Sequence, residues 1–409
     1  MSKNLHLEHI EDLMLMFGTD GIKESFDYID DLVRTFSANP SGNRNISTKW
    51  DGAPAIFCGP DPYDGRFFVA KKGIFNKKPK LYKSITEIDE DKLAEGLKTT
   101  FKSVFTHMKP IYDSGKLKDV VQGDFLFESG GRTLKRVHGE DCVLFKPQLI
   151  VYCIPKHDEL YEKAKRCKLC VVIHAKYPAA GAKHVSDLSV NFGFDASQHS
   201  TDDCLIISPF TSELGKSMII TPAEKRKLIE YKRASTRLSS QCGSFLNTIA
   251  SDYENKWGVS YLLKQYFNAR VREGQKVNSA SVFYRDFINY FETKFRDEIA
   301  KKAQDKTKAM WKKKMYDGLD VLENSKTEFV AMVGLYNTIQ NVKSIFIPKF
   351  ESGERFKTFY YNEKDGSYDI GDQEGYVVVK ESTRAVKIVQ RLGGFSERNF
   401  NEMKKWAKQ

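Results

Sequence analysis

The spacing of hydrophobic residues changes three times along the chain, and each change predicts a different kind of structure. Residues 1–45 place apolar side chains mostly three or four positions apart, which predicts amphipathic helices. From about Lys49 to Phe210, short β-branched and aromatic runs alternate with turn residues, which predicts strands. Residues 221–345 return to the helical spacing, and strand-like runs resume after Pro348. The pattern predicts an α+β protein with a large all-helical insertion.

Turn residues separate the predicted strands. Asp61–Pro62 and Asp64–Gly65 predict a hairpin that leads into Arg66–Ala70. Lys380–Arg384 allows a second hairpin, and one amphipathic helix is expected at about Ile88–Met108. The other expected strands cover residues 120–127, 143–145, 149–152, 169–174, 359–361, 375–379 and 385–389.

The helical insertion has a recognisable beginning. Thr221 is followed by Pro222 at the first helical position and by Glu224 at the third, which is typical of a helix start. We expect roughly four to six helices after it. The predicted organisation is an N-terminal helical segment at 1–45, a first strand-rich part at 46–220, the insertion at 221–345 and a second strand-rich part at 346–409.

Charge indicates a class of partner. The chain has 409 residues and a formal net charge of +11. Residues 221–345 hold 23 Lys and Arg against 14 Asp and Glu, and Lys312, Lys313 and Lys314 form a run there. Concentrated positive charge favours a polyanionic partner, most often nucleic acid, although a solvated helical face has the same composition.

Other classes of protein are less well supported. No apolar run reaches about 18 residues, so no membrane span is expected, and the N-terminus lacks the apolar core of a signal peptide, which predicts a cytoplasmic protein. The seven scattered cysteines predict reduced thiols, since Cys167, Cys170 and His174 lack the further ligands of a zinc site. No P-loop, G-x-S-x-G or H-E-x-x-H pattern is present.

The stretch Ile46–Phe57 combines two apolar runs with reactive residue types. Lys49, Asp51 and Gly52 lie between the runs, which predicts a strand, a tight turn and a returning strand. Lys49 and Asp51, two positions apart at a strand end, would share one face. A lysine held in this way is a candidate covalent nucleophile when its amine is kept unprotonated, whereas a surface hairpin with a solvated lysine has the same pattern.

Lys49–Trp50–Asp51–Gly52 resembles motif I of the nucleotidyltransferases that form a lysine–nucleotide phosphoramidate, namely DNA ligases, RNA ligases and capping enzymes. Together with Gly65–Val69, it is most similar to the ligase-like proteins of tailed bacteriophages. The resemblance extends from Leu5 to about Phe210 and from Glu374 to the C-terminus. It implies a ligase-type nucleotidyltransferase domain, with antiparallel sheets around an ATP cleft, in which Lys49 receives AMP.

Two further segments resemble the family's motifs III and IIIa. Val121–Leu126 places Asp124 where the family usually has a glutamate near the ribose or a metal ion. Val171–Tyr177 is similar to motif IIIa, whose aromatic residue commonly stacks on the base, and both Tyr177 and His174 are candidates. A capped strand end or a packed aromatic side chain explains the same residues without a ligand.

The C-terminal strands resemble motifs IV and V. Glu374 precedes a hydrophobic strand as in motif IV, which implies that it binds a divalent cation, Mg²⁺ or Mn²⁺, together with Asp124. Lys387 matches the motif V lysine that contacts the α-phosphate. Solvated side chains beside buried strands are the alternative for Glu374 and Lys387.

Two departures from the family pattern concern positive charge. The arginine that often follows motif I is Pro54 here, and the second lysine of motif V is Val389. Lys71, Lys72 and Arg391 are the candidates for the missing charge.

The resemblance implies an ATP-dependent polynucleotide ligase that joins a 5′-phosphate to a 3′-hydroxyl through a lysyl-AMP intermediate. RNA is the preferred substrate over DNA, because DNA ligases add an oligonucleotide-binding barrel after motif V, and only 18 residues follow Arg391. The insertion would then bind the nucleic acid. The other interpretation is a degenerate member that binds nucleic acid or a protein without ligation, and the sequence leaves ATP and GTP open.

Overall fold

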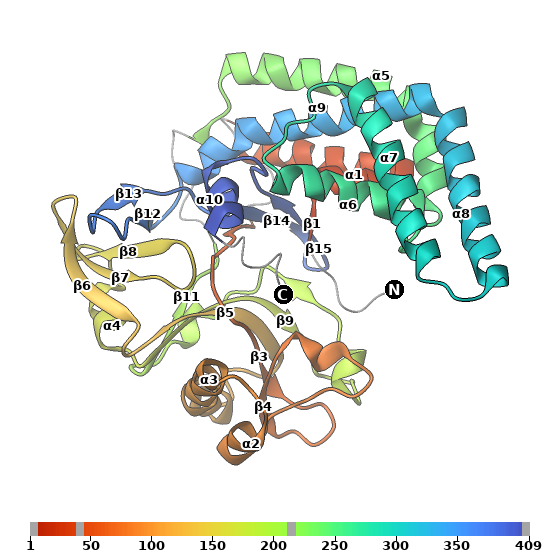
Figure 1. The fold of residues 1–409 in the computed structure, drawn as a ribbon. Helices are drawn as coiled ribbons and strands as arrows, with labels where there is room; N and C mark the ends of the chain where they lie inside the picture. Colours follow the sequence, from red (N-terminus) through yellow and green to blue (C-terminus); the bar gives the residue numbers. More distant parts are fainter. Residues whose placement is uncertain (1–6, 38–44, 211–217, 403–409) are drawn as a thin grey trace. The chain divides into compact units, whose positions relative to one another are not determined.

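The computed structural model describes residues 7–37, 45–210 and 218–402. They form a mixed structure with 49% helix and 20% strand, which confirms the predicted α+β class. Internal contacts divide the chain into two units, shown in Figure 1. We call residues 45–210 and 350–387 the sheet unit, and residues 8–37, 218–349 and 388–402 the helical unit.

The largest sheet of the sheet unit has the strand order β10-β9-β5-β3-β4, with β11 beside β9. Its pairs are antiparallel except for β9 and β11, which run parallel. The hairpin predicted at Asp61–Gly65 is confirmed, because β3 and β4 pair across it. The strands are β3 (Ala55–Pro60), β4 (Phe67–Ala70), β5 (Val120–Glu128), β9 (Leu169–Tyr177), β10 (Asn191–Phe192) and β11 (Cys204–Ile207).

The two faces of this sheet have different coverings. Alternate residues of a strand point to opposite faces, so Ile56 packs with one hydrophobic cluster and Phe57 with the other. Ile56 belongs to the cluster that includes Phe101 and Met108 of α3, so α3 covers that face. The single helix predicted at Ile88–Met108 is two helices, α2 (Ile85–Glu90) and α3 (Glu95–Asp113).

A second sheet joins strands from both ends of the insertion. Its order is β13-β12-β8-β7-β6, and β12 pairs antiparallel with β8. Chain segments that lie far apart in sequence therefore complete one sheet. The elements are β6 (Arg132–Val137), β7 (Glu140–Phe145), β8 (Val151–Pro155), β12 (Lys357–Tyr361) and β13 (Tyr368–Ile370), with α4 (Tyr161–Arg166) after β8.

A third set of strands has the order β15-β14-β2, formed by β2 (Ile46–Thr48), β14 (Tyr376–Glu381) and β15 (Arg384–Ile388). The hairpin predicted at Lys380–Arg384 is confirmed, since β14 and β15 are neighbours joined by a short turn. Both strands expected within Ile46–Phe57 are present as β2 and the start of β3, but the expected return of one along the other is wrong, because β2 pairs with β14 while β3 pairs with β4 and β5. Residues 49–54 therefore pass from one sheet to another.

The helical unit contains five helices in the described part of the predicted insertion, within the expected range. The helix start at Thr221 is confirmed, because its hydroxyl accepts a hydrogen bond from the backbone N–H of Glu224 and the Glu224 carboxylate accepts from Thr221. The helices are α5 (Pro222–Ala250), α6 (Val259–Arg272), α7 (Ala280–Ala300), α8 (Asp305–Asn324) and α9 (Lys326–Glu351).

The flanking ends of the chain also contribute to the helical unit. α1 (Leu13–Thr35) packs on α5, and α10 (Gly394–Glu402) belongs to the same unit, as do β1 (Glu8–His9) and the 3-10 turn Ile10–Asp12. α1 bends at Gly18, whose positive φ of 59° suits glycine. A Cβ there would lie 2.2 Å from the Asn247 side chain, which accepts a hydrogen bond from the N–H of Thr19.

Two further expectations concern the cysteines and the membrane. All seven cysteines lie within the described ranges as buried, free thiols, as the sequence predicts. Across the described ranges, no helix has the length and apolar character needed to span a bilayer.

Candidate functional site

Lys49 and Glu374 lie side by side because β2 and β14 pair. Tyr376 of β14 is opposite Thr48 of β2, and just beyond this pair the Lys49 backbone N–H donates a 2.8 Å hydrogen bond to the Gly375 carbonyl. The Lys49 ammonium forms an ion pair with the Glu374 carboxylate. Their side chains are 27% and 21% exposed, so the pair is partly open to solvent. The motif I and motif IV candidates therefore meet.

Asp51 fixes the segment that follows Lys49. Its side chain is 5% exposed, and Oδ2 accepts hydrogen bonds from the backbone N–H groups of Leu149 (2.6 Å) and Ile150 (2.9 Å). The Asp51 N–H donates to the Tyr152 hydroxyl at 2.8 Å, and the Trp50 ring packs on Tyr152. Burial raises the pKa of Asp51, while the two N–H donors oppose this effect. One oxygen of Asp51 thus anchors this segment to the beginning of β8.

Asp124 lies on β5 opposite Ala55 of β3. Gly52 comes so close that a Cβ there would lie 2.4 Å from the Asp124 Cβ, which explains the glycine at this position. His174 Nε2 is 3.5 Å from Asp124 Oδ2. Between Gln122 and Gly123 the pairing with β9 shifts and skips His174. This bulge places His174 beside Asp124.

The two candidates for stacking on a base have different surroundings. Tyr177 is buried against Phe57 and Phe75, and its hydroxyl donates a 2.7 Å hydrogen bond to the Gln122 side chain. His174 is partly exposed beside Asp124. A ligand next to Asp124 would therefore reach the imidazole of His174 more directly than the ring of Tyr177.

We call Lys49, Asp51, Asp124 and Glu374 the Lys49 cluster. The charges of the other three side chains influence the pKa of Glu374. Burial raises the pKa of Glu374; Lys49 lowers it, and the carboxylates of Asp51 and Asp124 raise it further. Three carboxylates against one ammonium leave an excess of negative charge that favours a bound cation.

A metal ion in this cluster would need ligands from outside the protein. In the described parts of the chain, no group of three or more His, Cys, Asp or Glu side chains is arranged to hold a metal ion. Asp124 and Glu374 offer two carboxylates, and Mg²⁺ commonly uses one or two together with water and substrate phosphates. The donor set fits Mg²⁺ brought with a nucleotide better than a permanently bound ion.

Sequence reasoning missed a buried acid next to Lys49. The hydroxyl of Thr48 donates to Glu354, at 2.9 Å from Oε1 and 3.1 Å from Oε2. Burial raises the pKa of Glu354 to about 7, and the hydrogen bond from Thr48 opposes this effect. Glu354 lies just after α9 and in no motif, so no sequence signal connected it with Lys49. The same is true of Tyr152, which appeared only as a strand residue.

The other basic residues proposed from the sequence lie on other elements than the Lys49 cluster. Lys387 is half-buried on β15, and β14 lies between β15 and β2 in the strand order. Burial lowers the pKa of Lys72 in the 3-10 turn Lys72–Phe75. Arg391 belongs to the helical unit, where it bonds to Asp12.

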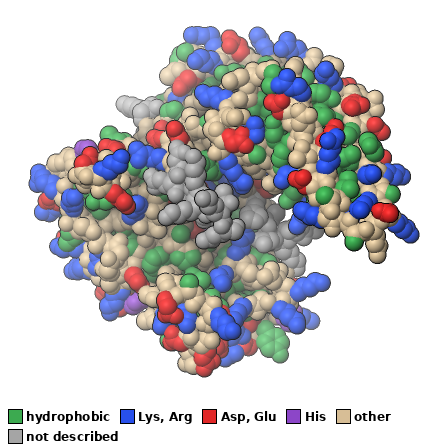
Figure 2. All heavy atoms as spheres, viewed as in Figure 1, with side chains coloured by type: hydrophobic (Ala, Val, Ile, Leu, Met, Phe, Trp, Pro, Cys, Tyr) green, Lys and Arg blue, Asp and Glu red, His purple; other side chains and the backbone are tan. Residues whose placement is uncertain are grey.

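The lysine run lies on α8. Lys312, Lys313 and Lys314 are exposed, and none of them forms an ion pair with an acidic residue of the described chain. The Lys314 ammonium is 5.3 Å from the centre of the Trp311 ring. On the face shown in Figure 2, basic and acidic side chains are interspersed over the helical unit rather than gathered into one continuous basic surface.

Fold and site together define a class: a mixed α+β protein with a lysine–carboxylate cluster where separate antiparallel sheets meet. The chain belongs to a family of unknown function (DUF6267), which matches residues 4–404. Neither the curated proteins nor the solved structures contain a match to the chain.

Proposed function

We propose that the protein is an ATP-dependent polynucleotide ligase that works through a lysyl-AMP intermediate, with RNA as the preferred strand and DNA as the alternative. The observation that carries this proposal is the ion pair of Lys49 with Glu374, in one cluster with Asp51 and Asp124. A partly exposed lysine among carboxylates has both an amine for attack and acids for a metal–nucleotide complex. The ligase-type fold is part of the proposal and is supported by the order of the motif-like segments.

The first step uses Lys49 as the nucleophile. An ammonium group does not attack phosphorus, so Lys49 must first lose a proton, and the contacting carboxylate of Glu374 is the acceptor that the geometry offers. The raised pKa of Glu374 favours this transfer. The amine then forms a bond to the α-phosphorus of ATP, the bond to the β-phosphate oxygen breaks, and pyrophosphate leaves. Asp51 holds the Lys49 segment in place during attack.

Asp124 and Glu374 would hold Mg²⁺, directly or through water, once the proton that Glu374 takes from Lys49 has passed to solvent. Mg²⁺ bound there supplies charge that offsets the negative charge developing on the phosphoryl oxygens. Lys387 would contribute further positive charge to the α-phosphate from β15. AMP then passes from Lys49 to the 5′-phosphate of a strand, and a 3′-hydroxyl displaces it as the strand is sealed.

The test is covalent labelling of the full chain with ATP radiolabelled in the α-phosphate, in the presence of Mg²⁺. The wild-type protein should acquire a label that acid releases and base does not, as a phosphoramidate does. Lys49→Ala should abolish the label, and Lys313→Ala on exposed α8 is the matched control that should keep it. Persistent labelling of Lys49→Ala would remove Lys49 from the reaction.

A sealing assay separates the substrates. The labelled protein is offered 5′-phosphorylated single-stranded RNA and nicked duplex DNA, and joined product is measured for each. Product with RNA supports the preferred substrate, and product only with DNA supports the alternative. A protein that takes up AMP but joins neither strand is no ligase of these substrates.

A further inference from the structure

A pocket of about 520 Å³ lies in the helical unit, among α6, the segment before α7, α9 and residues 390–392. Four of the described residues that line it are basic and none is acidic: Arg270, Lys276, Lys343 and Arg391. Six more carry side-chain amides: Gln275, Asn278, Asn337, Gln340, Asn341 and Gln390. The volume falls within the range of about 300–1,000 Å³ that is usual for small-molecule sites.

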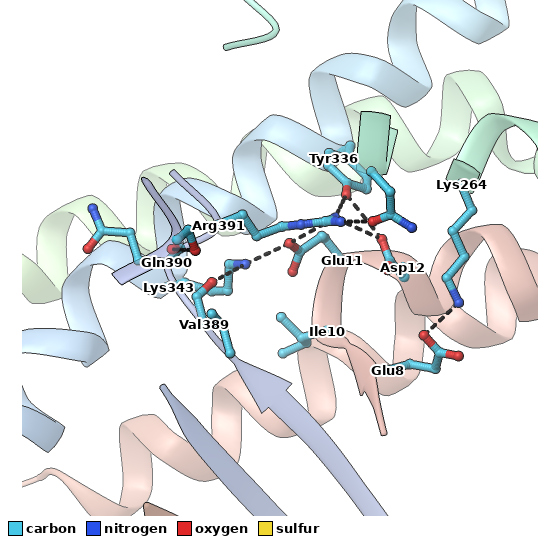
Figure 3. A network of polar contacts seen from close by, with 12 residues as sticks. Glu8, Ile10, Glu11, Asp12, Lys264, Tyr336, Lys343, Val389, Gln390 and Arg391 are labelled. Atoms are coloured by element: carbon cyan, nitrogen blue, oxygen red, sulfur yellow. Dashed lines mark hydrogen bonds and ion pairs between the residues drawn. The ribbon is translucent and has the colours of Figure 1, made fainter. Parts of the chain in front are cut away.

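Two of the basic side chains that line this pocket, Lys343 and Arg391, belong to the network of polar contacts shown in Figure 3. Arg391 and Lys343 are each only 5% exposed. Arg391 donates hydrogen bonds to the Tyr336 hydroxyl, to Asp12 and to the side chain of Asn268 on α6. Lys343 donates to Glu11 at 2.6 Å and to the Val389 carbonyl at 3.0 Å.

Glu11 and Asp12 lie behind the pocket lining and compensate the two buried cations. A buried ionic network resists rearrangement, because breaking an ion pair in it leaves an uncompensated charge. The network therefore forms a fixed wall. The groups that could bind a ligand are therefore the other two basic residues and the side-chain amides.

Lys276 has its ammonium available for a ligand, whereas Arg270 is partly engaged within the protein. Arg270 binds Glu273 and Gln275 through its terminal nitrogens, whereas its Nε is buried and has no hydrogen-bond partner. Lys276 is exposed and forms no ion pair with the acidic residues of the described chain. An unpartnered buried donor costs free energy unless a ligand or water satisfies it.

We propose that this pocket binds a phosphorylated nucleotide, either free or as the end of a polynucleotide strand. Arg270 and Lys276 would bind the phosphate, since guanidinium and ammonium groups are its usual partners. The amides have both donors and acceptors, which the edges of a base and the ribose hydroxyls require. Gln275 already accepts from Arg270 and Asn337 donates to the Val277 carbonyl, but inorganic phosphate alone would leave the other four amides unused. The proposal goes beyond the ligase reaction and does not depend on Lys49.

The test is equilibrium binding of four probes to the full chain: AMP, adenosine, and a tetraribonucleotide with a 5′-phosphate or a 5′-hydroxyl. Arg270→Gln/Lys276→Gln should weaken binding of the phosphorylated probes at least about tenfold, because each lost contact is a charge-assisted hydrogen bond. Lys301→Gln/Lys302→Gln removes the same charge from the same unit, where both lysines already pair with Glu298, and should change affinity less than about twofold.

A second variant protects the test against misfolding. Asn341→Asp places a negative charge in the pocket at an exposed position and should also weaken binding about tenfold. Thermal unfolding of each variant should match that of the wild type. Binding of AMP as well as the strand supports a free nucleotide, and binding of the 5′-phosphorylated strand alone supports a strand end.

Three results would overturn the proposal. The first is the absence of saturable binding of both phosphorylated probes to the wild type. The second is equal binding of adenosine and AMP together with equal binding of the two strands. The third is a loss in the Arg270/Lys276 variant no larger than that in the matched control. None of these results bears on the labelling of Lys49.

Discussion

At the scale of single residues, neighbours from distant parts of the chain determine what each ionisable group can do. Lys49 has Glu374 as its ion-pair partner, whereas one carboxylate oxygen of Asp51 accepts hydrogen bonds from two backbone N–H groups. Asp51 is consequently better suited to positioning than to contact with a substrate. Asp124 and Glu374 keep oxygens that a cation could use.

Substitution of these two acids tests their assignment. Glu374→Ala should lower labelling by ATP by roughly two orders of magnitude or more, because it removes preorganised charge from the reacting phosphate. Asp124→Glu should retain more labelling than Asp124→Ala, since it keeps the carboxylate. Glu381→Ala, at the exposed far end of β14, is the control and should label normally. Normal labelling of Glu374→Ala would show that the motif IV assignment is wrong.

At the scale of secondary-structure elements, the end of β2 is held from two sides. Strand β14 pairs with its backbone, and Glu354 accepts a hydrogen bond from the side chain of Thr48. Because the folded-state pKa of Glu354 is raised to about 7, the folded protein binds this proton more tightly than the unfolded chain does.

The pH dependence follows from this difference. The stabilising contribution of protonated Glu354 is complete below the unfolded pKa of about 4.5 and is lost as the pH rises through about 7. Denaturant unfolding of the wild type should therefore show about 1–3 kcal/mol lower stability at pH 8 than at pH 5 from this group alone. Glu354→Gln keeps an acceptor without titrating, so its stability should fall less over that interval. Identical changes in both proteins would exclude Glu354 as the titrating group.

At the scale of the whole molecule, some lysines of the helical unit form ion pairs with acidic residues of the described ranges and others do not. Lys301 and Lys302 pair with Glu298, and Lys308 pairs with Asp305, whereas Lys312, Lys313 and Lys314 on α8 stand without an acidic partner in the described chain. Unpaired lysines are the ones that can exchange counterions for the phosphates of a nucleic acid.

Replacing all three unpaired lysines with glutamine should weaken RNA binding and flatten its salt dependence by up to about two to three units of slope. Labelling by ATP should stay nearly unchanged, because the Lys49 cluster lies in the sheet unit. The control replaces the paired lysines Lys301, Lys302 and Lys308 and should affect the slope less. Unchanged RNA affinity in the first variant would identify the run as a solvated helical face.

Local rules determined much of this protein from sequence alone. The turn at Asp61–Gly65, the cap at Thr221 and the positions of most strands and helices depend on neighbouring residues, and these predictions agree with the structure. The same holds for the α+β class, because the change from strand to helical spacing is itself local.

Only the tertiary structure decided which distant segments meet. Strand pairing depends on the whole set of available partners, so the sequence did not predict that β2 would pair with β14 instead of β3. That pairing brings Glu374 to Lys49. α1 packs on α5 in the helical unit, and its helical spacing alone did not indicate this partner. Burial raises the pKa of Glu354, and Arg391 is buried as well. Such burial arises from contacts between segments hundreds of residues apart, so the residues next to these side chains in sequence do not predict it.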